Sequence, residues 1–170
     1  MMESLFYIAA VIALSSTALA LTRANAVHAL IYLIVSLLAV AVLFFMMGAP
    51  FAAALEVLIY AGAIMVLFVF VIMMLNLGEA GEAQERSGLH PRNWILPGIM
   101  AAMLFMELLF ALQQAPALTS GIAISPKEVG LTLFGPYVLA VELASMLLLA
   151  GLVGAYHLGR RFIVRSGSDD

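Results

Sequence analysis

The chain has 170 residues, of which 65% are hydrophobic and 10% are charged, and its formal net charge is -3. Soluble domains carry about 25% charged residues, so this chain has too few charged side chains to cover a water-facing surface. Its 7 lysine and arginine residues do not provide a nucleic-acid-binding surface. The absence of cysteine excludes disulfides, zinc–thiolate sites and iron–sulfur ligation by this chain.

Five apolar stretches are long enough to cross a lipid bilayer as helices. A helix needs about 20 apolar residues to span a hydrocarbon core about 30 Å thick. We predict an all-α integral membrane protein with five transmembrane helices, at about residues 4–22, 27–47, 51–77, 94–112 and 137–159. The connections between them are too short for a water-soluble domain, so residues 1–170 are predicted to form a single membrane domain.

The positive charges predict the orientation of the chain, because lysine and arginine are retained on the cytoplasmic side of a membrane. Lys127 lies in one set of connections, and the remaining cations lie in the other set or in the tail: Arg23, Arg86, Arg92, Arg160, Arg161 and Arg165. The N-terminus is therefore predicted to lie outside and the C-terminus in the cytoplasm.

The outer connection before the last span carries a helix-start signal. In the run Ser125-Pro126-Lys127-Glu128, the serine can cap a helix, the proline suits its first turn and the glutamate completes a capping box. We expect a short amphipathic helix that continues to about Phe134, where glycine and proline follow. The inner connection, residues 78–93, is expected to be a solvated or partner-facing loop with no catalytic role.

Motifs for nucleotide binding, metalloprotease chemistry and nucleophilic catalysis are absent from the sequence. His28 and His157 lie near the predicted cytoplasmic ends of helices, and His90 lies in the inner loop. This distribution is more typical of interfacial histidines than of haem ligands. The sequence therefore predicts no catalytic, cofactor-binding or metal site within this chain.

Three carboxylates lie within the predicted spans: Glu56, Glu107 and Glu142. An ionised side chain near the bilayer centre costs about 2.5–3.5 kcal/mol on insertion scales. They could belong to a proton path or to a coupling network facing a partner, or they could be neutral groups that hydrogen-bond between helices. Both interpretations stay open for Glu56 and Glu142. The structural one is favoured for Glu107, because its neighbours are uniformly apolar.

Two further patterns in the spans concern helix packing. Ala9, Ala13 and Thr17 recur four residues apart and permit close contact between helices. In the third span, the run Tyr60–Met65 holds three small residues next to a polar aromatic side chain. Glycine inside a helix costs about 0.8–1.0 kcal/mol relative to alanine, and Gly62 is therefore explained either by a π-bulge or, more commonly, by close packing.

Several segments resemble the J subunits of bacterial respiratory complex I, the proton-pumping NADH:quinone oxidoreductase, which are equivalent to mitochondrial subunit six. The segments are Ala26–Leu30, Leu55–Val57, Tyr60–Phe70, Phe134–Tyr137 and Leu139–Ser145. They cover the second, third and fifth spans, whereas the first span, the fourth span and the tail match only in character.

The resemblance implies a multi-pass subunit of the bacterial inner membrane without a redox centre. NADH, FMN, iron–sulfur clusters and quinone would be used by other subunits. Its implied neighbours are the small K subunit, the quinone-site subunit and the antiporter-like subunits. The third helix of this family can hold a π-bulge. Glu56, Tyr60, Gly62 and Glu142 are the implied coupling or proton-path residues, whereas Glu107 is not part of the family pattern.

Three functions therefore remain in competition. The leading one is a non-redox membrane-arm subunit that helps couple quinone reduction to proton pumping through its third helix. The alternatives are an independent small proton or ion transporter and a purely structural assembly subunit. Independent transport is disfavoured because the spans contain no lysine that could alternate with the acidic groups.

Overall fold

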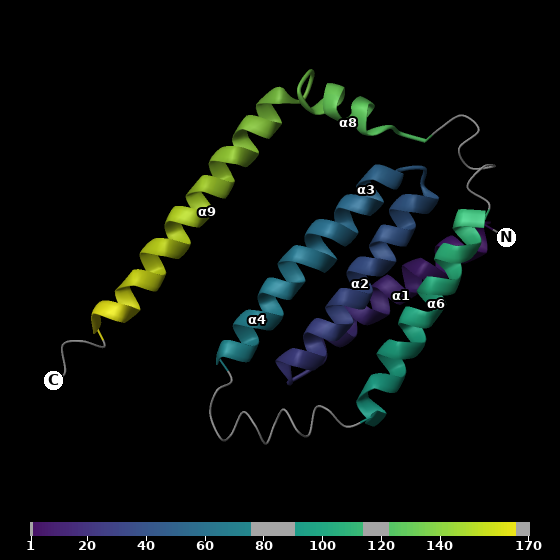
Figure 1. Cartoon of the computed structure of the whole chain (residues 1–170), viewed down its shortest axis with the longest axis horizontal. Helices are drawn as coiled ribbons and strands as arrows, with labels where there is room; N and C mark the ends of the chain where they lie inside the picture. Colours follow the sequence, from purple (N-terminus) through teal and green to yellow (C-terminus); the bar gives the residue numbers. More distant parts are fainter. Residues whose placement is uncertain (1, 76–90, 114–122, 166–170) are drawn as a thin grey trace. The chain divides into compact units, whose positions relative to one another are not determined.

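The computed structural model describes residues 2–75, 91–113 and 123–165, and it divides into two compact units, Met1–Ser125 and Pro126–Asp170 (Figure 1). Every regular element within the described ranges is a helix. The first unit contains α1 (Met2–Thr22), α2 (Ala26–Met46), α3 (Pro50–Leu55), the π-helix η1 (Glu56–Ile64), α4 (Met65–Leu75), the short 3₁₀-helix η2 (Pro91–Trp94) and α6 (Ile95–Gln113). The second contains α8 (Pro126–Leu133) and α9 (Val138–Arg165).

Among the described residues, five helical segments are long and apolar enough to cross a membrane. They are Glu3–Thr22, Ala26–Met46, Pro50–Met74, Ile95–Gln113 and Val138–Gly159. The all-helical fold and the five predicted spans are therefore confirmed, with boundaries that differ by at most one residue except at the end of the third span, which was predicted three residues later. Residues 76 and 77 of the third predicted span, the inner loop with Arg86 and His90, and the last part of the tail lie outside the described residues. The orientation across the membrane stays a prediction.

The second span begins at a well-formed helix cap. The side-chain oxygen of Asn25 accepts hydrogen bonds from the backbone N–H groups of Val27 and His28, at 2.9 and 3.3 Å. These N–H groups have no partner within the helix itself, so the asparagine satisfies them and fixes the start of α2. The tight connection holds the end of α1 next to the start of α2.

The second and third spans are joined by a glycine turn. Gly48 has a φ of 80°, a conformation that side chains rarely adopt. The N–H of Ala49 donates to the carbonyl of Phe44 at 3.0 Å, and the N–H of Gly48 donates to that of Phe45 at 3.1 Å. This is a Schellman motif, which satisfies the last carbonyls of α2. Pro50 then starts α3, where a missing N–H costs nothing.

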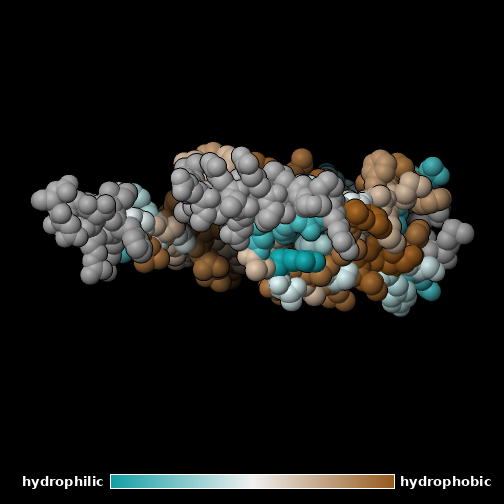
Figure 2. All heavy atoms as spheres, turned by 90° about the horizontal axis from the view of Figure 1, so that it is seen from below, coloured by the Kyte–Doolittle hydropathy of each residue, from teal (hydrophilic) through white to brown (hydrophobic). Residues whose placement is uncertain are grey.

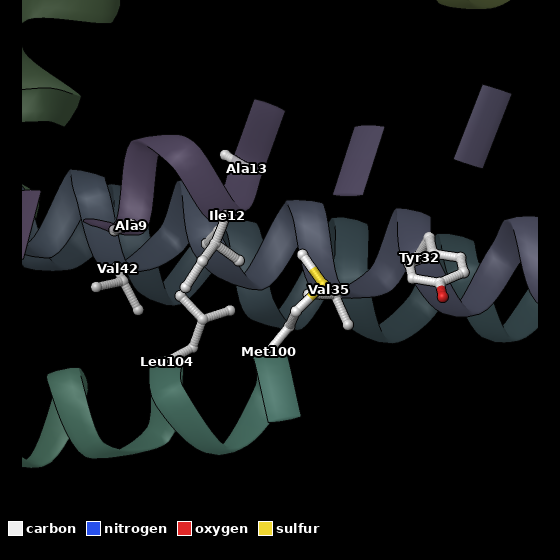
Figure 3. Packing of buried hydrophobic residues seen from close by; sticks show 9 residues of the cluster. Ala9, Ile12, Ala13, Tyr32, Val35, Val42, Met100 and Leu104 are labelled. Atoms are coloured by element: carbon white, nitrogen blue, oxygen red, sulfur yellow. The ribbon is translucent and has the colours of Figure 1, made fainter. Parts of the chain in front are cut away.

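The core of the first unit lies where α1, α2 and α6 meet. Its buried residues are Ala9, Ile12, Ala13, Tyr32, Val35, Ala39, Val42, Met100 and Leu104. Figure 3 shows Ile12 and Val42 close to Leu104, and Met100 close to Val35. Ala9 is fully buried and Ala13 nearly so, so these two small residues do serve intrachain packing.

A polar contact joins α1 and α2 inside this apolar core. The hydroxyl oxygens of Thr17 and Ser36 lie 2.6 Å apart, and the Ser36 hydroxyl also donates to the carbonyl of Ala13 at 3.2 Å. Ser16 is fully buried, and its hydroxyl donates to the carbonyl of Ile12 at 2.6 Å. Hydroxyl groups of this kind join membrane helices because lipid offers no competing partner.

The second unit consists of a short helix followed by a long apolar one. Helix α8 occupies the place predicted for a helix after Ser125, and α9 supplies the fifth span. No residue of the apolar window in α9 is buried by the described chain. The amphipathic character of α8, its location on the outer side and the single-domain organisation stay predictions.

The surface of the described chain is that of a lipid-facing or partner-facing protein. Large apolar side chains are exposed on all five spans, and hydrophobic side chains cover much of the surface in Figure 2. A group of hydrophilic side chains interrupts this surface at the end of the first unit where α2 and α6 begin. Few polar groups therefore remain as candidates for chemistry or recognition.

Candidate functional site

The third span is not a continuous α-helix. Residues Glu56–Ile64 form a nine-residue π-helix, η1, between α3 and α4. In a π-helix each backbone N–H donates to the carbonyl five residues earlier, and such segments are rare and frequent at functional sites. The last such bond joins the N–H of Met65 to the carbonyl of Tyr60. Of the two explanations for Gly62, the structure contains the π-helical one, and the segment starts four residues before Tyr60.

Gly62 fits the wider π turn because it lacks a side chain. A Cβ built at this position would lie 3.1 Å from the carbonyl oxygen of Val57, and ordinary van der Waals contact begins at 3.4 Å. Val57 lies five residues earlier, which is the spacing of the π hydrogen bond. A β-carbon would therefore press on the backbone that forms the π turn. The sequence had singled out Gly62 but not Val57, because a backbone contact leaves no signal in residue type.

No side chain of η1 is buried within the described chain. Leu58 is 68% exposed and Tyr60 51% exposed. The next residue after η1, Met65, is buried, with 5% of its surface accessible. The π segment thus presents its side chains to lipid or to another protein, while α4 begins from an anchored residue.

Glu56 is the first residue of η1 and is half-buried. Within the part of the chain that the structure describes, neither its carboxyl group nor the Tyr60 hydroxyl makes a side-chain hydrogen bond. Both polar groups therefore lie on the same irregular helix, and neither has a side-chain hydrogen-bond partner among the described residues. Their predicted role in coupling stays a prediction.

Glu142 lies in the second turn of α9, in the second unit, and its side chain is exposed. Its backbone carbonyl accepts a hydrogen bond from the Ser145 hydroxyl at 2.8 Å. Because α9 belongs to a separate unit, Glu142 is described by itself, and its predicted role with Glu56 stays a prediction.

Glu107 lies on the buried face of α6, together with Pro97, Met100, Leu104 and Ala111. Its side chain is 5% exposed, and neither carboxylate oxygen has a hydrogen-bond partner among the described residues. Glu107 was expected to join helices through a hydrogen bond to Ser, Thr or Tyr, and no such bond is present among the described residues. The hydroxyls of Thr17 and Ser36 are already paired with each other.

An apolar groove of about 600 Å³ runs beside the start of the π segment. It lies between α2, α6 and the third span, and its lining residues are Leu38, Ala41, Val42, Phe45, Pro50, Ala53, Ala54, Val57, Leu58, Ala101, Leu104, Phe105 and Leu108. The groove leaves the first turn of η1 without close packing on that side.

The described ranges contain no candidate metal site, because no three His, Cys, Asp or Glu side chains lie close enough together to hold an ion. The expected absence of metal and cofactor sites stays a prediction for the chain as a whole.

Comparison with known proteins gives consistent matches along the chain. The family described as NADH-ubiquinone/plastoquinone oxidoreductase chain 6 matches residues 16–158. A NADH-quinone oxidoreductase subunit J from Pseudomonas aeruginosa is 56% identical over 163 residues, which cover 94% of this chain and 98% of that protein. A protein of the same name from Escherichia coli strain K12 is 57% identical over 160 residues, covering 94% of this chain and 87% of the relative.

Proposed function

The chain belongs to the family of NADH-ubiquinone/plastoquinone oxidoreductase chain 6, and from this membership we propose that it is a non-redox membrane-arm subunit that helps couple quinone reduction to proton pumping. It is a multi-pass protein of the bacterial inner membrane, as its five spans and its bacterial relatives indicate. NADH, FMN, iron–sulfur clusters and quinone are then used by other subunits of the enzyme. Its neighbours in this proposal are the K subunit, the quinone-site subunit and the antiporter-like subunits.

The observation that carries the coupling proposal is the π-helix Glu56–Ile64 in the middle of an otherwise α-helical span. A π-bulge adds one residue to a turn, so its removal rotates the following helix by about 100°. Conversion of η1 to α-helix would therefore re-aim the apolar side chains of α4. Such a rotation can open or close a path for water between this subunit and its neighbours.

Gly62 supports this proposal because it allows both backbone registers. In the π register, glycine has no Cβ that could come too close to the Val57 carbonyl. In an α-helix glycine is also tolerated, at a cost of about 0.8–1.0 kcal/mol relative to alanine. The third span thus contains a π turn and, within it, a glycine that is compatible with both the π and the α hydrogen-bond register.

Glu56 and Tyr60 supply the polar groups that would respond to the rotation. Glu56 begins the π segment and Tyr60 lies within it, so a change of register alters where the Tyr60 hydroxyl lies relative to the carboxyl group. A hydroxyl and a carboxyl that exchange hydrogen-bond partners can make or break a short proton path. Glu142, from α9 in the other unit, is the other carboxylate for which we propose a role in coupling.

The test replaces Glu56 and Glu142 separately by glutamine, which keeps the shape of the side chain but does not titrate. We expect each variant to assemble and to keep electron transfer to quinone, while proton pumping per electron falls. The matched control is Glu107→Gln, which alters a carboxyl outside the proposed path and is expected to leave the pumping ratio unchanged. Full pumping in both the Glu56 and Glu142 variants would leave these carboxylates with a structural role only.

Purification in a mild detergent separates the proposal from independent transport. The membrane-arm proposal predicts that the chain is recovered with flavin-containing and iron–sulfur-containing subunits. Recovery as a stable oligomer of this chain alone would favour a small transporter instead.

A further inference from the structure

Apart from the polar residues of η1, a polar pocket lies at the end of the spans where α2 and α6 begin. It is a pocket of about 270 Å³ lined by Arg23, His28, Tyr32, Asn93 and Leu96. These residues come from the connection after α1, the first two turns of α2, the short helix η2 and the start of α6. From its position in the sequence, His28 was predicted to be an ordinary interfacial histidine, and no sequence pattern connects it with the other residues of the pocket.

Arg23 makes this pocket positively charged. Its guanidinium carbon lies 5.2 Å from the centre of the Tyr32 ring, a cation–π contact that holds the long side chain next to the pocket. Throughout the described ranges, no carboxylate forms an ion pair with this guanidinium, and no carboxylate lines the pocket. The N-terminal end of α2 adds the positive end of a helix dipole.

Tyr32 provides a hydrogen-bond donor without a partner. The residue is 4% exposed, packs in the apolar core and also lines the pocket. In the described part of the chain, its hydroxyl makes no hydrogen bond. The buried oxygens without a partner among the described residues are those of Glu107, so the Tyr32 hydroxyl is accessible from the pocket and can donate to a ligand there.

We propose that this pocket binds the phosphate group of an anionic phospholipid. The guanidinium offers parallel N–H donors that match two phosphate oxygens, and the Tyr32 hydroxyl can donate a further bond. The remaining polar lining groups, His28 and Asn93, stand at the same pocket. Basic pockets between transmembrane helices on the cytoplasmic side are a known form of anionic headgroup site, and the cytoplasmic side is where Arg23 is predicted to lie.

The surroundings favour a lipid over a free phosphate ion. Leu96 forms an apolar part of the pocket wall. Leu21, Ile95 and Ile99, near the same ends of α1 and α6, are 83%, 58% and 53% exposed. Acyl chains attached to a bound phosphate would run along these side chains, and a soluble ion would gain nothing from them. The site is independent of the π segment and of the proposed coupling.

The experiment uses the protein purified in mild detergent with its accompanying subunits. It is incubated with a phosphatidylglycerol that carries a photoreactive group in the acyl chain next to the headgroup. After illumination, peptide mass spectrometry locates the labelled residues. We expect labels near the end of α1 and the start of α6. A phosphatidylcholine with the same photoreactive chain, which carries no net charge, is expected to label these positions about tenfold less.

Two variants measure the contributions of Arg23 and Tyr32 to lipid binding, and a third serves as a control. Arg23→Gln removes the charge and should lower labelling about tenfold or more, because hydrogen bonds to charged groups are the strong ones. Tyr32→Phe keeps the ring under Arg23 and removes only the hydroxyl, so labelling should fall about three- to tenfold. Lys127→Gln is the matched control, since it removes one positive charge from a residue that does not line the pocket, and labelling should be unchanged.

Four results would overturn the proposal. One is equal labelling of Arg23→Gln and the unmodified protein, and another is equal labelling by the two lipids. Complete displacement of the lipid by millimolar inorganic phosphate would identify a site for the free ion. No labelling near the pocket, together with poor recovery of the Arg23→Gln complex, would indicate that an acidic side chain of another subunit fills it.

Discussion

Replacement of Gly62 by alanine tests whether the π register of the third span depends on the missing side chain. The added Cβ would lie 3.1 Å from the Val57 carbonyl oxygen in the π register. Both registers have helical backbone angles, so the higher helix propensity of alanine applies to both and cancels. The contact is with the carbonyl five residues earlier, which is the acceptor position of the π register, so conversion to the α register releases it.

The magnitude follows from that contact. Relief of a few tenths of an ångström of overlap with backbone costs about 1 kcal/mol, the lower end of the range for overpacking. A change of this size shifts the ratio of π to α register about fivefold towards the α-helix. If coupling requires both registers, pumping per electron should fall while electron transfer to quinone continues.

The assay combines a structure of the variant complex with the ratio of protons pumped to quinone reduced in membrane vesicles. Gly98→Ala is the matched control, because a Cβ at Gly98 in α6 meets nothing within 4 Å beyond the neighbouring backbone of its own helix. Gly98→Ala should leave both the register and the pumping ratio unchanged. If Gly62→Ala keeps the Met65 to Tyr60 bond in every state and pumps as well as Gly98→Ala, the contact with the Val57 carbonyl does not determine the register of the third span.

Three further predictions concern other parts of the chain. Glu107→Met should maintain or raise the resistance of the assembled complex to heat inactivation, because a buried group without a partner costs about 1–3 kcal/mol, and a clear loss would mean that another chain supplies a partner. Thr17→Val should lower stability by about 0.5–1.5 kcal/mol, measured by thermal unfolding, because it removes the 2.6 Å contact with Ser36; an unchanged midpoint would show that the contact contributes nothing. Cysteines at positions 87 and 120, outside the described residues, should react with an impermeant reagent from the cytoplasmic side and the outer side respectively, and the reverse pattern would mean an inverted topology.

The number and limits of the spans could be predicted because length and hydrophobicity determine them in a bilayer. A local helix-start signal was equally informative: the run Ser125-Pro126 predicted a short helix, and α8 begins at Pro126. Each of these features depends on neighbouring residues alone, so no tertiary arrangement had to be known.

The sequence did not allow a prediction of which face of each span packs against the other helices. Spans that are apolar on every side do not indicate which face is buried. The meeting of Arg23 and Tyr32 with Asn93 depends on how α6 packs against α2, and 60 or more residues separate Asn93 from the other two. The π register of η1 likewise could not be separated from close packing, because either one favours a glycine at position 62.

The most direct test of the coupling proposal is a pair of structures of the whole enzyme, one at rest and one during turnover with quinone. The informative bond is the one from the Met65 N–H, which donates to the Tyr60 carbonyl in the π register. We predict that in one state this N–H donates instead to the carbonyl of Ala61, four residues earlier, with α4 rotated by about 100°. A Met65 to Tyr60 bond retained in both states, with α4 in one orientation, would contradict the proposed switch.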